Sequence, residues 1–309
     1  MSLRSPRLRP ARSASTLVLA SAVALTAAAC GSTSSNPLGG GSGSAGSGSK
    51  VVVGSANYPE NVLLAAIYSQ ALQAKGVKVD EKFNIGSREV LYGQLKSGSL
   101  TVLPEYNGAL LQYLDPKSTA STTADVNAAL GKDLPANLGI LDSSAAEDKD
   151  SLTVTQATAS KYGLKSIADL AGKSQDFVIG GQPEFQSRRE QQFKDAYGLT
   201  FKEWKPTADT TANALADGSL QVGDVFTTDP RISQFNLVAL ADPKDVFGVE
   251  NVTPLVNKAG LSATATDALN AVSAKLDTAG LLALMKKVSV DKDDPEQVAK
   301  DWVKANGLG

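Results

Sequence analysis

Polar and aromatic side chains that can bind a solute stand in short loops just after apolar, strand-like runs. Asn57 and Tyr58 follow the run 51–53, and Thr228 and Asp229 follow a second such run. Open α/β sheets bind ligands at the carboxyl ends of their strands, so we expect these four residues to contact a small molecule. The alternative for Tyr58 is packing between two parts of the chain.

Two charged residues are further candidates for the same site. Arg88 begins a helix-like segment, and its planar fork can bind a carboxylate through two hydrogen bonds. Asp148 can attract a cation, although it stands in the charged run 147–150, and such runs are usually solvated. The alternative for Arg88 is an exposed surface residue with no role in binding. Arg188 and Arg189 also read as surface residues, unless one of them reaches across to another part of the chain.

The composition excludes several kinds of catalytic site. The 309 residues include no His, which removes His-based nucleophilic, general-base and zinc sites. The chain has one Cys, so it forms neither an intramolecular disulfide nor a cysteine metal cluster. No metal or cofactor motif occurs in a convincing context, and we expect no metal and no cofactor. Apart from the four arginines before residue 30, the chain has 26 basic and 32 acidic side chains, and such a mildly acidic body is a poor partner for nucleic acid.

The first 49 residues are typical of an exported, membrane-tethered protein. Four arginines precede an apolar run at 14–29 that is too short to span a bilayer comfortably. The run ends at Cys30, as in a bacterial lipobox, where the Cys would carry a lipid. We therefore predict a signal peptide over 1–29 and a flexible Gly/Ser-rich tether over 30–49. The alternative is an ordinary signal peptide with a chance Cys.

Strand-like and helix-like segments alternate from residue 50 onward. Strands are predicted at 51–53, 77–79 and 100–103, with helices at 59–75 and 88–96. This alternation favours parallel sheets with helices on both faces.

The same pattern occurs a second time further along the chain. Residues 177–184 echo 51–60, each with a strand, a glycine, a loop and Pro-Glu before a helix. Residues 215–222 echo 95–102 in the same order along the chain. We therefore expect two similar α/β lobes, with a cleft lined by the loops at the carboxyl ends of their strands.

An ordered set of short motifs resembles a known protein family. The set comprises GSANYPE (54–60), Arg88, PEYNG (104–108), IADL (167–170), PEF (183–185) and FTTD (226–229). Together they resemble the substrate-binding proteins of ABC importers for glycine betaine, carnitine and choline. The resemblance implies a type II periplasmic-binding-protein fold, with two α/β lobes joined by a hinge around a ligand cleft. It places lobe 1 at 50–106 plus 255–309, and lobe 2 at 107–254.

The resemblance also implies a role and a site. Members hold a quaternary ammonium between aromatic faces, through cation–π attraction. Tyr106 matches the family's hinge tyrosine, with hinge packing as the alternative, and Phe226 stands where a Tyr is common. The loaded protein would dock on a permease served by ATPase subunits at the outer face of the cell membrane. It would act as a monomer, held by the lipid on Cys30, and catalyse no reaction.

Two aromatic positions of the family pattern are altered in this chain. They align near Ser151 and Glu250, so two walls of the aromatic cage are replaced by polar or acidic groups. A ligand more polar or cationic than betaine is one consequence, and an amino acid or another small polar or aromatic solute is a second. Outside the binding proteins, the residues leave open a carboxylate-based hydrolase and a structural or adhesive lipoprotein without a cleft.

Overall fold

A computed structural model describes residues 50–309, which belong to one compact unit. The predicted signal peptide, Cys30 and the tether lie outside the described residues. No helix in the described part of the chain has both the length and the apolar character needed to cross a bilayer.

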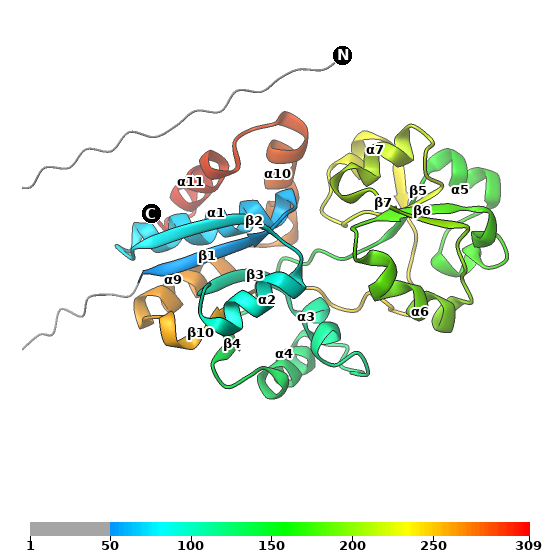
Figure 1. Ribbon diagram of the computed structural model, residues 1–309. Helices are drawn as coiled ribbons and strands as arrows, with labels where there is room; N and C mark the ends of the chain where they lie inside the picture. The colour runs from blue at the N-terminus through cyan, green and yellow to red at the C-terminus, as the bar shows by residue number, and fades with distance from the viewer. Residues whose placement is uncertain (1–49) are drawn as a thin grey trace, which may run out of the picture. The chain divides into compact units, whose positions relative to one another are not determined.

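Two five-stranded sheets organise the described chain (Figure 1). The first has the order β2-β1-β3-β10-β4, and the second has the order β7-β6-β8-β5-β9. The first sheet consists of β1 (Val51–Ala56), β2 (Val79–Gly86), β3 (Val102–Tyr106), β4 (Leu138–Ile140) and β10 (Val252–Asn257). The second consists of β5 (Leu152–Thr155), β6 (Val178–Gly181), β7 (Glu203–Pro206), β8 (Val222–Asp224) and β9 (Leu237–Ala239).

Helices cover both faces of each sheet, as the alternating pattern predicts. In the first sheet α1, α9, α10 and α11 share one core with β1 and β10, while α2, α3 and α4 share another. The helices that carry this first group are α1 (Pro59–Ala74), α2 (Arg88–Ser97), α3 (Asn107–Leu114), α4 (Thr123–Asp133), α9 (Ala263–Ser273), α10 (Thr278–Lys286) and α11 (Pro295–Ala305). Around the second sheet lie α5 (Gln156–Tyr162), α6 (Phe185–Tyr197), α7 (Thr211–Ala216) and α8 (Arg231–Gln234).

The ends of the helices follow local chemistry. Pro59 occupies the first turn of α1, where its missing N–H costs nothing, and Glu60 lies in the same turn near the positive end of the helix dipole. Gly98 ends α2 in the left-handed conformation with φ 82°, which glycine adopts without a Cβ penalty. The predicted helices starting at Pro59 and Arg88 are therefore confirmed.

The internal repeat in the sequence corresponds to equivalent places in the two sheets. Strands β1 and β6 hold the second position of their sheets, and β3 and β8 hold the third. A Cβ on Gly54 would lie 2.9 Å from Leu100, and a Cβ on Gly180 would lie 2.4 Å from Leu220. Glycine is needed at both positions because a leucine packs against the strand backbone there. This leucine comes from the second repeated segment of the same lobe, 95–102 or 215–222.

The sheets are mixed rather than wholly parallel, which corrects the sequence expectation. β1 runs parallel to β2 and β3, but β10 runs antiparallel to β3 and β4. In the second sheet β5 is antiparallel to β8 and β9. β5 and β10 are the strands that follow each crossing of the chain between the sheets, so each enters its sheet in the opposite direction.

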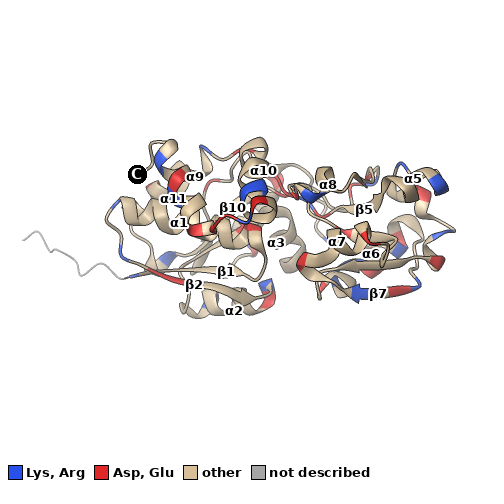
Figure 2. Ribbon diagram, turned by 90° about the horizontal axis from the view of Figure 1, so that it is seen from above, with Lys and Arg blue, Asp and Glu red and all other residues tan. Residues whose placement is uncertain are grey.

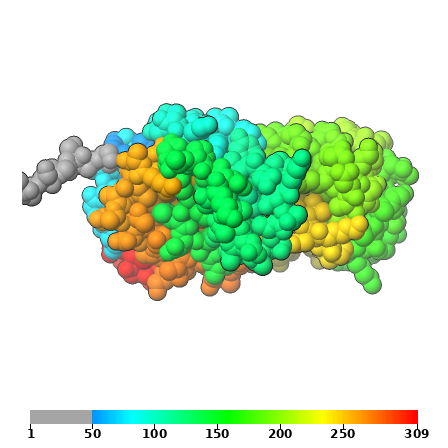
Figure 3. Space-filling view, turned by 90° about the horizontal axis from the view of Figure 1, so that it is seen from below, coloured from blue at the N-terminus to red at the C-terminus, as the bar shows by residue number. Residues whose placement is uncertain are grey.

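The lobe boundary predicted after Tyr106 does not match the sheets. Residues 107–147 return to the first sheet, where β4 pairs with β10. The backbone N–H of Asp142 donates to Asn270 Oδ1 of α9, and Figure 3 shows this green segment beside the orange α9 region. The chain crosses at 147–151 and returns at 248–251, where Glu147 and Asn251 form an antiparallel bridge.

We therefore call residues 50–147 and 251–309 the first lobe, and residues 148–250 the second lobe. The end of lobe 2 predicted at residue 254 lies within a few residues of the observed return crossing. Acidic and basic residues are interspersed along both lobes in the view of Figure 2.

Candidate ligand-binding site

A cavity of about 360 Å³ is lined by residues of both lobes. The first lobe supplies the loop after β1, the start of α2, the end of β3 and part of α3. The second lobe supplies the crossing segments, the start of α6 and the end of β8. This volume suits a small organic molecule.

Five aromatic side chains line the cavity: Tyr58, Tyr106, Tyr113, Phe185 and Phe226. The rings of Tyr58 and Phe226 pack against each other across the lobes, tilted by 37° with centroids 5.3 Å apart. Aromatic faces attract a cation placed within about 6 Å of the ring centre. The cavity therefore offers π-faces from both lobes.

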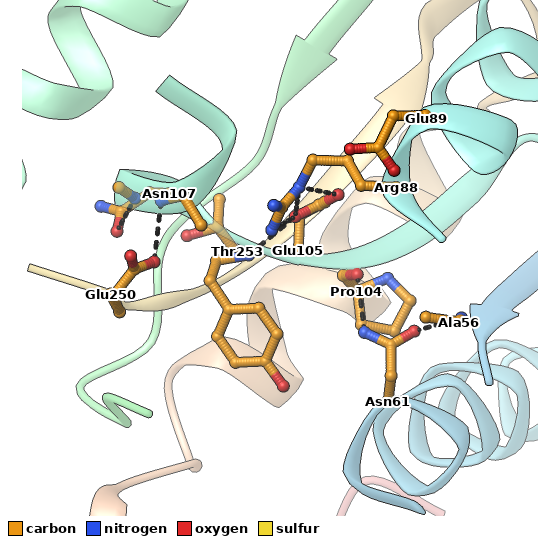
Figure 4. A network of polar contacts seen from close by, with 12 residues as sticks. Ala56, Asn61, Arg88, Glu89, Pro104, Glu105, Asn107, Glu250 and Thr253 are labelled. Atoms are coloured by element: carbon orange, nitrogen blue, oxygen red, sulfur yellow. Dashed lines mark hydrogen bonds and ion pairs between the residues drawn. The ribbon is translucent and has the colours of Figure 1, made fainter. Parts of the chain in front are cut away.

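Arg88 is bonded to a protein carboxylate at the edge of the cavity (Figure 4). Its Nε lies 3.0 Å from Glu105 Oε1, and its Nη2 lies 2.9 Å from Glu105 Oε2. Both side chains are largely buried, with exposed fractions of 12% and 7%. The Arg88 guanidinium, which we predicted to bind a ligand carboxylate, is thus already paired with a carboxylate of the protein.

The other two arginines of the cavity are also paired with acids. Arg188 Nη2 lies 2.9 Å from Glu89 Oε1, which joins α6 to α2 across the lobes. Arg189 Nη2 lies 2.9 Å from Asp150 Oδ2, and its guanidinium stacks over the ring of Phe247. The alternative that one of these residues reaches the other lobe therefore holds for Arg188.

Acidic side chains outnumber basic ones around the cavity. Asp148, Asp224 and Glu250 line it without an ion-pair partner among the described residues. Burial raises the pKa of Glu250 to about 8, and it raises the pKa values of Asp148 and Asp224 well above the usual range. A solute with positive charge would stabilise the ionised forms of all three.

A buried polar cluster joins the lobes beside the cavity. Tyr106 Oη donates to Glu60 Oε1 at 2.6 Å, and the Thr228 hydroxyl donates to Glu60 Oε2. Asp148 Oδ1 accepts from the backbone N–H of Thr228 at 3.0 Å. Burial raises the pKa of Glu60, while the hydrogen bonds from Thr228 and Tyr106 oppose that shift.

Asn61, which directly follows the first motif, and Gly108 of the PEYNG segment position the cavity wall. Asn61 Oδ1 accepts from the backbone N–H of Ala56 at 2.7 Å, and its Nδ2 donates to the carbonyl of Pro104 at 3.0 Å (Figure 4). This side chain ties the end of β1 to the middle of β3. A Cβ on Gly108 would lie 1.9 Å from the carbonyl oxygen of Val249, so the PEYNG segment needs glycine there.

The structure brings most of the predicted site residues together. Six of the eight line the cavity: Asn57, Tyr58, Arg88, Tyr106, Asp148 and Phe226. Thr228 and Asp229 line a smaller adjoining cavity of about 30 Å³ instead. Asp229 accepts from Arg231 Nη2 at 2.6 Å, so its carboxylate has an internal partner two residues away.

Of the two altered cage positions, one lines the cavity and the other does not. Glu250 lines the cavity, and its Oε2 accepts from the backbone N–H of Ala109 at 2.8 Å. Ser151 is not among the lining residues, because its hydroxyl donates to the carbonyl of Val225 at 2.6 Å.

Sequence reasoning missed several lining residues. Tyr113, Phe185 and Gln192 lie on helices, where periodicity marks only a helix face and not the cavity it borders. Asp224 ends β8 just before the FTTD motif, so its place at a strand's carboxyl end was a usable signal. No cluster of three or more metal-ligating side chains occurs within residues 50–309.

Comparisons with known proteins agree with this architecture. Residues 49–305 match the family OpuAC, described as the substrate binding domain of an ABC-type glycine betaine transport system. The glycine betaine-binding protein YehZ of Escherichia coli is 29% identical over 84% of this chain and 91% of its own length. A Helicobacter pylori ergothioneine transport permease and binding protein, EgtU, is 26% identical over 84% of this chain and 48% of its length.

Solved structures share the arrangement of two α/β lobes. The crystal structure of a glycine betaine/carnitine/choline ABC transporter protein has a TM-score of 0.66 and 21% identity. It covers 84% of this chain and 99% of the other. The fold is that of the periplasmic binding proteins.

The chain belongs to the family of substrate-binding proteins of ABC-type glycine betaine transport systems. It is therefore an extracytoplasmic binding protein of an ABC importer, with a small solute as ligand and a permease as partner.

Proposed function

We propose that the protein binds a small quaternary-ammonium solute of the glycine betaine, choline or carnitine type in the cavity and delivers it to its permease. The observation that carries the proposal is the ring pair Tyr58–Phe226, one ring from each lobe, bordering a cavity rich in carboxylates. A quaternary ammonium has no N–H to donate, so aromatic faces and negative charge are the groups that recognise it. The relative YehZ is named for glycine betaine.

In this proposal some of the predicted binding residues contact the solute directly, and Thr228 acts through its neighbours. Tyr58, Tyr106 and Phe226 supply faces for the ammonium group, and Asn57 contacts the remainder of the solute. Asp148 contributes negative charge at the cavity wall. Thr228 acts indirectly, because its hydroxyl holds Glu60 and its backbone N–H holds Asp148.

The proposal includes how the protein is held and how it acts. Cys30 carries the lipid that anchors it to the outer face of the cell membrane, and the segment up to residue 49 is the tether. It works as a monomer and catalyses no reaction. Metabolic labelling with a fatty-acid analogue tests the anchor: label should appear on the parent chain and be absent from Cys30→Ser.

Thermal unfolding of residues 50–309, one compact unit, against a ligand panel tests the binding proposal. The panel holds glycine betaine, choline, carnitine, amino acids and polyols. A ligand at about 100 times its Kd stabilises the fold by about 2.7 kcal/mol, which raises the Tm by roughly 5–10 °C for a protein of this size. Stabilisation by the quaternary amines supports the proposal. A shift with amino acids or polyols alone, or none at all, contradicts it.

A further inference from the structure

The groups that would bind a ligand carboxylate are already occupied within the protein. Each arginine of the cavity has a carboxylate partner: Arg88 with Glu105, Arg188 with Glu89, and Arg189 with Asp150. The Glu89 carboxylate lies in the first turn of α2, so it also takes the anion position at that helix start. A ligand anion would meet only uncharged donors such as Asn57 and Gln182.

Asp224 presents the opposite situation. It lies at the end of β8, lines both the main cavity and the smaller adjoining one, and is 7% exposed. Its Oδ1 is shielded from solvent and has no hydrogen-bond partner among the described residues. A buried carboxylate without a donor is costly. Because the Asp224 side chain borders the cavity, a donor that a solute brings to this carboxylate would lower that cost.

Asp224 stands beside the aromatic part of the cavity. Residues two apart in an extended segment point to the same side, and both Asp224 and Phe226 line the same cavity. Gly181 has no side chain and so leaves room for that of Asp224. A Cβ on Gly181 would lie only 3.0 Å from the Asp224 Cβ. A cation held against Phe226 thus has a carboxylate within the same wall.

We propose that Asp224 makes this protein selective for solutes that carry a net positive charge and an O–H or N–H donor, in preference to zwitterions. The Asp224 carboxylate accepts the hydrogen bond from that donor, and the solute's charge compensates the excess acidic groups. This inference rests on the proposed function and names its substrate class.

Choline and glycine betaine are the matched probes for this selectivity. Both contain a trimethylammonium group, but choline ends in a hydroxyl and glycine betaine ends in a carboxylate. The hydroxyl can donate to Asp224, whereas the carboxylate would meet a wall of acidic side chains with paired arginines. The two probes therefore share the same aromatic contacts and differ only at the other end of the molecule, which is a hydrogen-bond donor in choline and an anion in glycine betaine.

Isothermal titration of the purified protein with both probes, in the parent and in Asp224→Asn, tests the proposal. We expect the parent to bind choline at least about tenfold more tightly than glycine betaine. Because a hydrogen bond to a charged group contributes about 1.5–3 kcal/mol, Asp224→Asn should weaken choline binding by about tenfold or more. Its affinity for glycine betaine should stay equal or increase.

The controls separate the two kinds of failure. Asp176→Asn makes the same chemical change at an exposed position of the second lobe, and it should leave both affinities unchanged. The Tm of ligand-free Asp224→Asn should equal or exceed that of the parent, since no protein donor loses a partner. A parent that prefers glycine betaine, or an unchanged choline affinity in a folded Asp224→Asn, overturns this proposal alone. Absence of binding by both probes overturns this proposal, and absence of carnitine binding in addition overturns the proposed function.

Discussion

The hydroxyl of Thr228 donates a hydrogen bond to the carboxylate of Glu60, and this bond joins the second lobe to the start of α1 in the first. Both side chains are buried, and Glu60 also accepts from Tyr106. A residue that the FTTD motif marked for ligand contact thus connects the lobes beside the cavity.

Replacing Thr228 by Val removes this hydroxyl and keeps the side-chain shape. We expect the free energy of unfolding to fall by about 1–3 kcal/mol, because one buried oxygen of Glu60 loses its donor. The Tm should fall by roughly 2–12 °C. Thermal unfolding measures the change, and Thr264→Val at an exposed position of α9 serves as the matched control. Equal Tm values for the two variants would contradict the connection.

Glu250→Gln should change how stability depends on pH. Burial raises the pKa of Glu250 to about 8 in the folded state, against 4.5 as its ordinary value, with Arg189 lowering and Asp150 raising it. Between these pH values the folded state holds a proton that the unfolded chain releases. Stability contributed by this group therefore falls as pH rises, by at most about 1.4 kcal/mol per pH unit.

The measurement is Tm against pH from 5 to about 8.5 for the parent and Glu250→Gln. The variant should gain stability relative to the parent as pH increases, because it lacks the group that must ionise. A constant difference across this range would show that Glu250 does not titrate there.

Arg88→Met should destabilise the first lobe strongly. It leaves Glu105 buried without its ion partner, which costs about 3–5 kcal/mol. Adding Glu105→Gln should recover a large part of that loss, since the uncompensated charge is removed. Urea unfolding of both single variants and the double variant measures the coupling. Additive effects would mean that the pair is not formed in solution.

The assignment of Arg88 as a clamp for a ligand carboxylate stays a prediction, and the same variants test it. Should the stable double variant bind glycine betaine as well as the parent does, Arg88 acts within the protein. A selective loss of glycine betaine binding, with choline binding unaffected, would show that Arg88 binds the ligand carboxylate.

Choline binding should release protons near neutral pH. In the empty cavity burial favours the protonated forms of Asp224 and Glu250, and a bound cation favours their ionised forms. Titrations in buffers of different ionisation enthalpy should therefore give different apparent binding enthalpies at pH 7. The difference should shrink in Asp224→Asn. Buffer-independent enthalpies in the parent would count against proton release.

Phe226→Leu should weaken binding of choline, because it removes an aromatic face and keeps an apolar side chain. Cation–π attraction contributes about 0.5–2 kcal/mol, which corresponds to a loss of roughly 2-fold to 30-fold in affinity. Phe226→Tyr should retain affinity. Tyr162→Leu on α5, outside the cavity lining, controls for losing an aromatic ring. A Phe226→Leu variant with parental affinity would remove Phe226 from the site.

Local sequence patterns predicted much of the architecture for clear physical reasons. Pro59 and Glu60 mark the start of α1, and Gly98 marks the end of α2. The repeat of strand, glycine and loop at 51–60 and 177–184 predicts two similar lobes, which the corresponding places of β1 and β6 in their sheets bear out. The lobe boundary escaped prediction because β4 is three residues long and carries no periodic signal.

The sequence by itself determined the repeated α/β units, the family and the loops that border the cavity, because these depend on local propensity and on motifs read in order. Tertiary structure alone decided which charges are paired: Arg88 with Glu105, Arg189 with Asp150, and Asp224 with no described donor. Such pairings join residues 17 or 39 positions apart. They depend on how strands and helices pack in space, and the order of residue types does not encode that directly.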